Sequence, residues 1–186
     1  MSHADGLSIE YERHEGVREL IDAVRFCLEG LSLGFDGHDD PSRKGPGAYL
    51  AVVAGRDIAE HADPMGDNRW PVEESRVPLS DLDRFYDALA EVALTRDGAV
   101  VLSVDGVLQE QMVRFRDHPE SGTEYADWMG SRHMSALDTS RRESVVATLT
   151  LSQESGRVSV FRDGGYEAVP REGIAARWRA ENDHPL

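Results

Sequence analysis

Two pairs of β-prone apolar segments have only a short turn between their members, and this feature constrains the fold most. Residues 99–104 (AVVLSV) and 107–115 flank an Asp-Gly dipeptide typical of tight hairpins. Residues 144–151 (SVVATLTL) and 157–161 (RVSVF) flank a second turn, Glu-Ser-Gly. Parallel neighbours need a long crossover connection, which such turns do not supply. We therefore expect antiparallel hairpins rather than a purely parallel doubly wound sheet.

Helical periodicity lies between these strand segments. A first helix is predicted by apolar residues at helical spacing: Val17, Leu20, Ile21, Val24, Cys27, Leu28 and Leu31. A buried strand is expected after it at 48–53 (AYLAVV). A capping-box pattern from Ser80 to Asp83 opens a second helix that ends near Thr95. A third helix is expected at 124–137, and a short polar one from about Gly173.

These elements predict an α/β (α+β-like) fold: a mixed central β-sheet with helices packed around it. A length of 186 residues favours a single globular domain. We divide it into a polar lead-in at 1–15, the main domain at 16–165, and a tail with a short helix at 166–186.

Charge excludes some partners. Asp and Glu number 35 against 20 Lys and Arg, a net charge of −15, so neither nucleic acid nor an anionic membrane surface is an expected partner. Lys44 is the only lysine among the 20. An acidic, lysine-poor chain is typical of a salt-rich cytoplasm, where short-range screening removes its self-repulsion. The alternative is an ordinary acidic bacterial protein from a GC-rich genome.

The single cysteine, Cys27, excludes an internal disulfide framework and lies on the apolar stripe of the first helix. No apolar run is long enough for a membrane span, and the start of the chain lacks the pattern of a secretion signal. The expected location is therefore the cytoplasm.

Common nucleotide, zinc and hydrolase motifs are absent, and three short segments of unusual content remain. They are Asp97-Gly98-Ala99 before a strand, Gly130-Ser131-Arg132-His133 in or opening a helix, and SQESG at 152–156 in a hairpin turn. Each alone has an ordinary reading as a turn, a solvated helix face or a hairpin. An acidic loop (Asp36, His38, Asp39, Asp40) fits no standard metal spacing and is interpreted as solvated.

Taken together, the order and spacing of the three segments resemble the diadenylate cyclase family (the DAC or DisA N-terminal domain). The sequence reads DGA-VVLSVDGVL, then GSRHMSAL, then SQESG-RVSVF, and similarity extends over about residues 16–165. With the acidic composition, the resemblance is to a stand-alone, haloarchaeal-type member.

The resemblance implies an enzyme that condenses two ATP into cyclic di-AMP and two pyrophosphates. Asp97, Arg132 and His133 would be the catalytic residues. Asp97 would accept the proton of the 3′-hydroxyl or orient it, the Arg132 guanidinium would bind phosphate oxygens, and His133 would donate a hydrogen bond to a phosphate. Further ATP contacts would come from backbone and small side chains of the motifs and from an adenine-pocket position: Gly98, Ala99, Leu108, Gly130, Ser131 and Ser152. Glu154 would help to hold Mg²⁺ or Mn²⁺.

Four positions depart from the family pattern: Arg96, Met134 (normally arginine), Ser135 and Gln153. They leave fewer family-typical groups at the expected phosphate and metal sites. Arg141 or Arg142 could supply the missing positive charge. Two alternatives to the cyclase therefore stay open: a catalytically degenerate module that binds ATP or cyclic di-AMP, and an acidic interaction protein without a ligand. Because the product is two-fold symmetric, an active cyclase requires a head-to-head homodimer or a larger oligomer that contains it.

Overall fold

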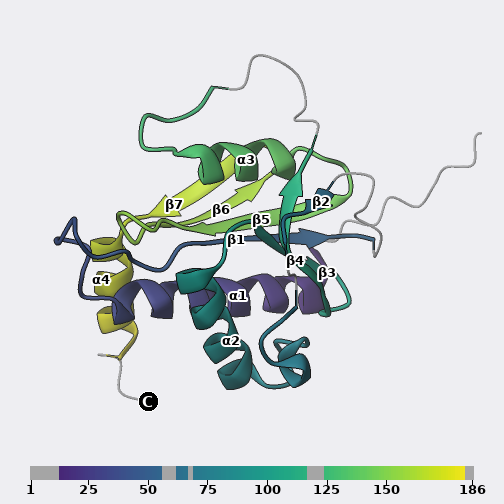
Figure 1. The fold of residues 1–186 in the computed structure, drawn as a ribbon, viewed down its shortest axis with the longest axis horizontal. Coiled ribbons are helices and arrows are strands. Elements are labelled where there is room, and N and C mark those ends of the chain that lie inside the picture. The colour runs from purple at the N-terminus through teal and green to yellow at the C-terminus, as the bar shows by residue number, and fades with distance from the viewer. Residues whose placement is uncertain (1–12, 56–61, 67–68, 117–123, 183–186) are drawn as a thin grey trace, which may run out of the picture.

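The computed structural model describes residues 13–55, 62–66, 69–116 and 124–182, and these form one seven-stranded mixed sheet with helices on both faces (Figure 1). The strand order is β2-β4-β3-β1-β5-β6-β7. The strands are β1 (Ala48–Val53), β2 (Ala62–Pro64), β3 (Ala99–Ser103), β4 (Leu108–Phe115), β5 (Val145–Leu151), β6 (Val158–Arg162) and β7 (Gly165–Val169). The helices are α1 (Glu15–Gly34), the 3₁₀ turn η2 (Glu73–Ser75), α2 (Leu82–Thr95), α3 (Ser131–Ser140) and α4 (Arg171–Asn182). The predicted α/β fold with a mixed sheet is confirmed.

The central strand β1 explains the layering. All six of its residues are buried, and alternate side chains belong to two different apolar clusters. Ala48, Leu50 and Val52 pack with α1 and α2, whereas Tyr49 and Ala51 pack with the face that α3 covers. In Figure 1, α3 lies on one side of the sheet, and α1, α2 and α4 lie on the other. A strand buried on both faces is apolar throughout, which is why AYLAVV has no polar alternation.

The first two helices follow their apolar stripes. The predicted stripe of α1 is buried from Val17 to Leu31, and Cys27 within it is fully buried. Burial raises the pKa of the Cys27 thiol to about 12, so this residue is an apolar packing group. The N-cap of α2 is Asp81, whose side chain accepts from the Arg84 amide, and not Ser80 as expected.

The expected helix at 124–137 is wrong at its start. The residues from 124 to 130 contain only a turn, and α3 begins at Ser131 with Gly130 as its N-cap, in an extended conformation. Two edge strands were not expected: β2 in the loop at 54–79, and β7 across the expected boundary at 165. β7 pairs with β6 over its whole length, so this part of the tail belongs to the sheet.

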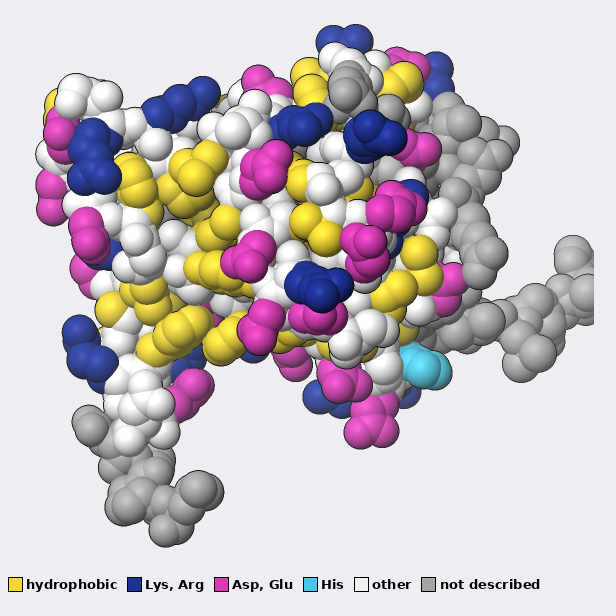
Figure 2. All heavy atoms as spheres, turned by 60° about the horizontal axis from the view of Figure 1, so that its bottom comes forward, with side chains coloured by type: hydrophobic (Ala, Val, Ile, Leu, Met, Phe, Trp, Pro, Cys, Tyr) yellow, Lys and Arg dark blue, Asp and Glu magenta, His cyan; other side chains and the backbone are white. Residues whose placement is uncertain are grey.

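The surface over α1, α2 and α4 carries acidic and basic side chains mixed with apolar patches (Figure 2). None of the helices in the described ranges has the length and apolar character needed to cross a membrane.

Candidate functional site

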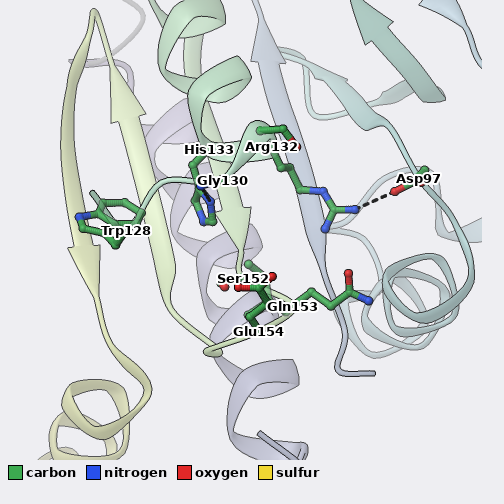
Figure 3. A pocket seen from close by; sticks show the side chains of 10 residues that line it. Asp97, Trp128, Gly130, Arg132, His133, Ser152, Gln153 and Glu154 are labelled. Carbon is green, nitrogen blue, oxygen red and sulfur yellow. Dashed lines mark hydrogen bonds and ion pairs between the residues drawn. The ribbon is translucent and has the colours of Figure 1, made fainter. Parts of the chain in front are cut away.

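Strand directions bring the three sequence motifs to one edge of the sheet. β3 runs parallel to β1, so the start of β3, after Asp97, lies beside the start of β1. β5 runs antiparallel to β1 and pairs Leu151 with Ala48, so the end of β5, before Ser152, reaches the same edge. The first turn of α3 lies above these strand ends and contributes Arg132 and His133 (Figure 3).

Asp97 and Arg132 form an ion pair across this edge, with 3.0 Å between Asp97 Oδ1 and Arg132 Nη2. The Asp97 side chain is 80% exposed and that of Arg132 is 23% exposed. Figure 3 shows the guanidinium extending over the strand ends toward the carboxylate. A pair this open to solvent contributes little to stability, so its value lies in placing an acceptor and a cation side by side.

His133 is the third residue of α3 and is fixed by its own helix start. Its Nδ1 accepts from the Gly130 N–H at 3.3 Å, and its ring meets the edge of Trp128 with 5.2 Å between centroids. Burial, followed by the charges of Arg132 and Arg157, lowers the pKa of His133 to about 4. The imidazole is therefore neutral near pH 7.

The tautomer follows from this hydrogen bond. Because Nδ1 accepts, the proton of neutral His133 is on Nε2. Nε2 is buried and has no hydrogen-bond partner among the described residues. A buried N–H without a partner is costly, and a phosphate oxygen in the adjoining pocket would satisfy it.

The turn after β5 presents the remaining motif. Ser152 holds it from within: its Oγ accepts from the Ser155 N–H at 3.2 Å, and its carbonyl accepts from the Gly156 N–H at 2.9 Å. Gly156 has φ +73° and receives a hydrogen bond from the Ser32 hydroxyl at the end of α1. Glu154 is left exposed at the tip.

These groups surround a pocket of about 280 Å³. The lining includes seven of the predicted site residues: Asp97, Gly130, Ser131, Arg132, His133, Ser152 and Glu154. The departure Gln153 also lines it, together with Trp128 and Leu151. The sequence segments therefore converge around one concave surface.

Three predicted residues do not line this pocket. Gly98 (φ +86°) makes the backbone turn behind Asp97, and Ala99 is buried against the α3 side of the sheet. Leu108, expected at an adenine pocket, is 1% exposed and lies in the core with α1 and α2. Met134, at the position where arginine is normal, packs against the apolar cluster under α3.

Neither arginine considered as compensation for Met134 lies at the site. Arg141 is at the C-terminal end of α3 beside Gly164, and Arg142 donates to the Arg116 carbonyl. A helix of ten residues is roughly 15 Å long, so both guanidinium groups start from the far end of α3.

The sequence reasoning missed an aromatic and cationic pair beside His133. The Arg157 guanidinium lies 4.4 Å from the centre of the Trp128 ring, a cation–π contact. Trp128 also lines the pocket. The only signal for Trp128 was a tryptophan two residues before Gly130, in a segment predicted as helix.

The donor set is compatible with Mg²⁺ or Mn²⁺ brought by a nucleotide. Glu154 and Asp97 offer hard oxygen ligands at the pocket. No cluster of three or more His, Cys, Asp or Glu suited to a metal occurs in the ranges described. Mg²⁺ typically uses one or two carboxylates and takes its other ligands from phosphates and water, so the residues suit a metal–triphosphate complex rather than a metal bound alone.

Comparison with known proteins finds a family model that spans the three motifs. Residues 82–166 match the family model described as DisA bacterial checkpoint controller nucleotide-binding (DAC). The matched segment runs from α2 to the start of β7 and contains all three motifs. Over this segment the chain is similar to the DAC nucleotide-binding family, in agreement with the resemblance seen in the sequence; the haloarchaeal detail stays a prediction.

Two solved structures are similar to this chain, and the first of them shows the same fold. A hypothetical membrane spanning protein from Bacillus cereus is 17% identical, with a TM-score of 0.54 over 81% of this chain. The present chain spans 63% of the length of that structure. DacA from Staphylococcus aureus, solved as a double cysteine mutant, is 18% identical with a TM-score of 0.48, over 88% of this chain and 95% of that one. No curated protein matches the chain by sequence.

Proposed function

We propose that the chain is a diadenylate cyclase that joins two ATP molecules into cyclic di-AMP and releases two pyrophosphates. The observation that carries the proposal is the Asp97–Arg132 pair on the pocket, beside the buried N–H of His133. A carboxylate next to a guanidinium offers a proton acceptor and a phosphate fork at the same place.

In each half-reaction a 3′-hydroxyl oxygen attacks an α-phosphorus, and the bond from that phosphorus to the pyrophosphate oxygen breaks. Asp97 orients the hydroxyl and accepts its proton. Arg132 and the Nε2–H of His133 bind phosphate oxygens, where negative charge grows on the leaving group. Ser131 and Ser152 add hydroxyl contacts from the pocket wall. Bound Mg²⁺ or Mn²⁺, held in part by Glu154, would neutralise triphosphate charge.

The two-fold product requires two nucleotides facing each other, whereas the described part of one chain presents one such set of motifs. The proposal therefore includes a head-to-head homodimer, in which the 3′-hydroxyl of one nucleotide faces the α-phosphate held by the other chain. We infer a cytoplasmic enzyme whose partners are ATP and a second copy of itself.

The test is incubation of the purified protein with ATP and Mg²⁺ or Mn²⁺, followed by chromatography for a cyclic dinucleotide. Asp97→Asn should abolish the product and leave ATP binding in place. Asp87→Asn, an exposed aspartate on α2, serves as the matched control and should keep full activity. If no dinucleotide forms with Mg²⁺ and none forms with Mn²⁺, the cyclase proposal is refuted.

Met134 favours a second candidate, a module that binds ATP or cyclic di-AMP without turnover. Because its side chain packs into the core, it adds no cation to the phosphate pocket. A melting temperature that rises with ATP or cyclic di-AMP, without product formation, would support this module. No response to any adenine nucleotide would favour a ligand-free interaction protein.

A further inference from the structure

A larger cavity, of about 630 Å³, adjoins the candidate site and lies mostly outside the segment that matches the family. Its wall is the loop from His38 to Lys44, closed by Gln153 and Glu154. Gln153 and Glu154 also line the pocket of Asp97 and Arg132. The two hollows therefore share the 152–156 turn as a common wall.

Lys44 lies where the cavity meets the candidate site. It lines the large cavity, and it also lines a cleft of about 80 Å³ with Asp97 and Arg132. The next residue, Gly45, packs so closely on the turn that a Cβ there would lie 2.8 Å from the Gln153 carbonyl oxygen. The packing of Gly45 therefore fixes the Lys44 backbone beside the turn.

The nitrogen groups of this cavity have few partners. Both ring nitrogens of His38 are buried and make no hydrogen bond with any described residue. Arg43 lies over the Phe35 ring at 5.2 Å, and within the described ranges neither Arg43 nor Lys44 forms an ion pair with a carboxylate. Among the described residues, the wall thus carries a lysine without an ion pair, an arginine held over Phe35 near Asp40, and an imidazole whose nitrogens lack hydrogen bonds. Such nitrogen groups favour an anionic ligand.

The carboxylates of the loop form no ion pair with Arg43 or Lys44 within the described ranges. Asp40 Oδ1 accepts from both the N–H (2.9 Å) and the hydroxyl (2.6 Å) of Ser42, and the Arg43 N–H donates to the Asp40 carbonyl. These bonds define the loop. Asp39 and Glu154 are exposed to solvent.

We propose that the His38–Lys44 cavity binds the terminal diphosphate of the nucleotide and holds pyrophosphate after the bond to the α-phosphorus breaks. This inference rests on the proposed function, because it extends the same site toward the leaving group. Lys44 supplies the charge that Met134 does not, and His38 and Arg43 contact the outer phosphate.

The single lysine makes a site-specific test possible. An amine-acylating reagent modifies only Lys44 and the terminal amine, which serves as an internal standard within the same chain. We expect pyrophosphate or ATP, each with Mg²⁺, to slow acylation of Lys44 several-fold, as measured by peptide mass spectrometry. AMP and sulfate at matched ionic strength should give no protection. Equal labelling of Lys44 in all samples would overturn the proposal.

Kinetics of Lys44→Gln provide a second readout. Loss of one phosphate contact should raise the KM for ATP about tenfold, equivalent to ~1.4 kcal/mol. Arg18→Gln, an exposed arginine on α1, is the matched control and should behave as wild type. An unchanged KM in Lys44→Gln would contradict the subsite.

Failure of the subsite and failure of the proposed function have different signatures. Protection of Lys44 by pyrophosphate without any dinucleotide product would preserve the anion site and reject the cyclase. Normal dinucleotide synthesis without protection would preserve the cyclase and reject the anion site.

Discussion

The guanidinium of Arg132 lies directly over the α-carbon of Gly47 on its way to Asp97. A Cβ on Gly47 would overlap Arg132 Nη1 and would lie 2.9 Å from the Cβ of Gln153. Gly47 is itself fixed at the start of β1, where its N–H donates to the Ala93 carbonyl at 2.9 Å. A residue without a side chain is thus required for the ion pair of the site to form.

Gly47→Ala should separate Arg132 from Asp97. Arg132 Nη1 is the end of a flexible side chain and can move aside, but the Gln153 Cβ is held by its backbone and must shift as well. The free energy of unfolding should therefore fall by about 1–2 kcal/mol. Misplacement of the phosphate fork should lower the rate of dinucleotide formation on the order of 100-fold. Gly34→Ala, in open space at the end of α1, is the control. Full activity of Gly47→Ala would contradict the role given to Arg132.

His133 should make stability fall in mild acid. Its pKa is near 6.5 in the unfolded chain and about 4 in the fold, so the unfolded state binds more protons between these values. The free energy of unfolding therefore decreases as the pH falls from about 6.5 to 4. Urea titrations at several pH values should show a smaller loss in His133→Gln than in wild type. Parallel losses in the two proteins would disprove the buried neutral imidazole.

Gly98 and Gly106 permit a comparison between steric crowding and backbone strain. They have almost the same φ, +86° and +83°. A Cβ on Gly98 would lie 2.9 Å from the Met112 backbone, whereas one on Gly106 meets nothing within 4 Å. Gly106→Ala should cost about 1 kcal/mol from the positive φ alone. Gly98→Ala should cost about 2 kcal/mol more, because backbone must shift; equal costs would show that the strands yield freely.

Salt should raise turnover if the active species is a homodimer. Each chain carries −15, so the approach of two chains is opposed at low ionic strength and eased when salt screens the repulsion. Initial rates measured from low to molar KCl should therefore increase, in step with the dimer fraction from light scattering. A steady fall in rate would count against both the dimer and the high-salt interpretation.

The hairpins and the buried central strand could be predicted because their signals are local. Alternating apolar residues, an Asp-Gly turn and a strand that is apolar on both faces can each be recognised from neighbouring residues alone. β2 and β7 could not be predicted in this way. β7 is an exposed or half-buried edge strand (GYEAV), and β2 is three residues long and ends in Pro64. Edge strands bury little, so their patterns carry little apolar signal.

The start of α3 was misjudged because composition did not reveal what Trp128 contacts. Its ring packs against His133, Arg157 and Tyr166, and this tertiary packing accompanies an extended segment before Gly130. At the site, the motif residues come together from separate elements as their spacing implied. Leu108 does not join them, because its position on β4 directs it to the opposite layer.

The register of Ala48 with Leu151 joins positions about a hundred residues apart, and it has a consequence for biosynthesis. Such long-range closure is slow to form. On the ribosome, β1 is made long before β5, so its Tyr49 and Ala51 face is synthesised well before α3 and β5, which cover it. During this interval the nascent chain exposes apolar surface, which makes it prone to aggregation until the sheet closes.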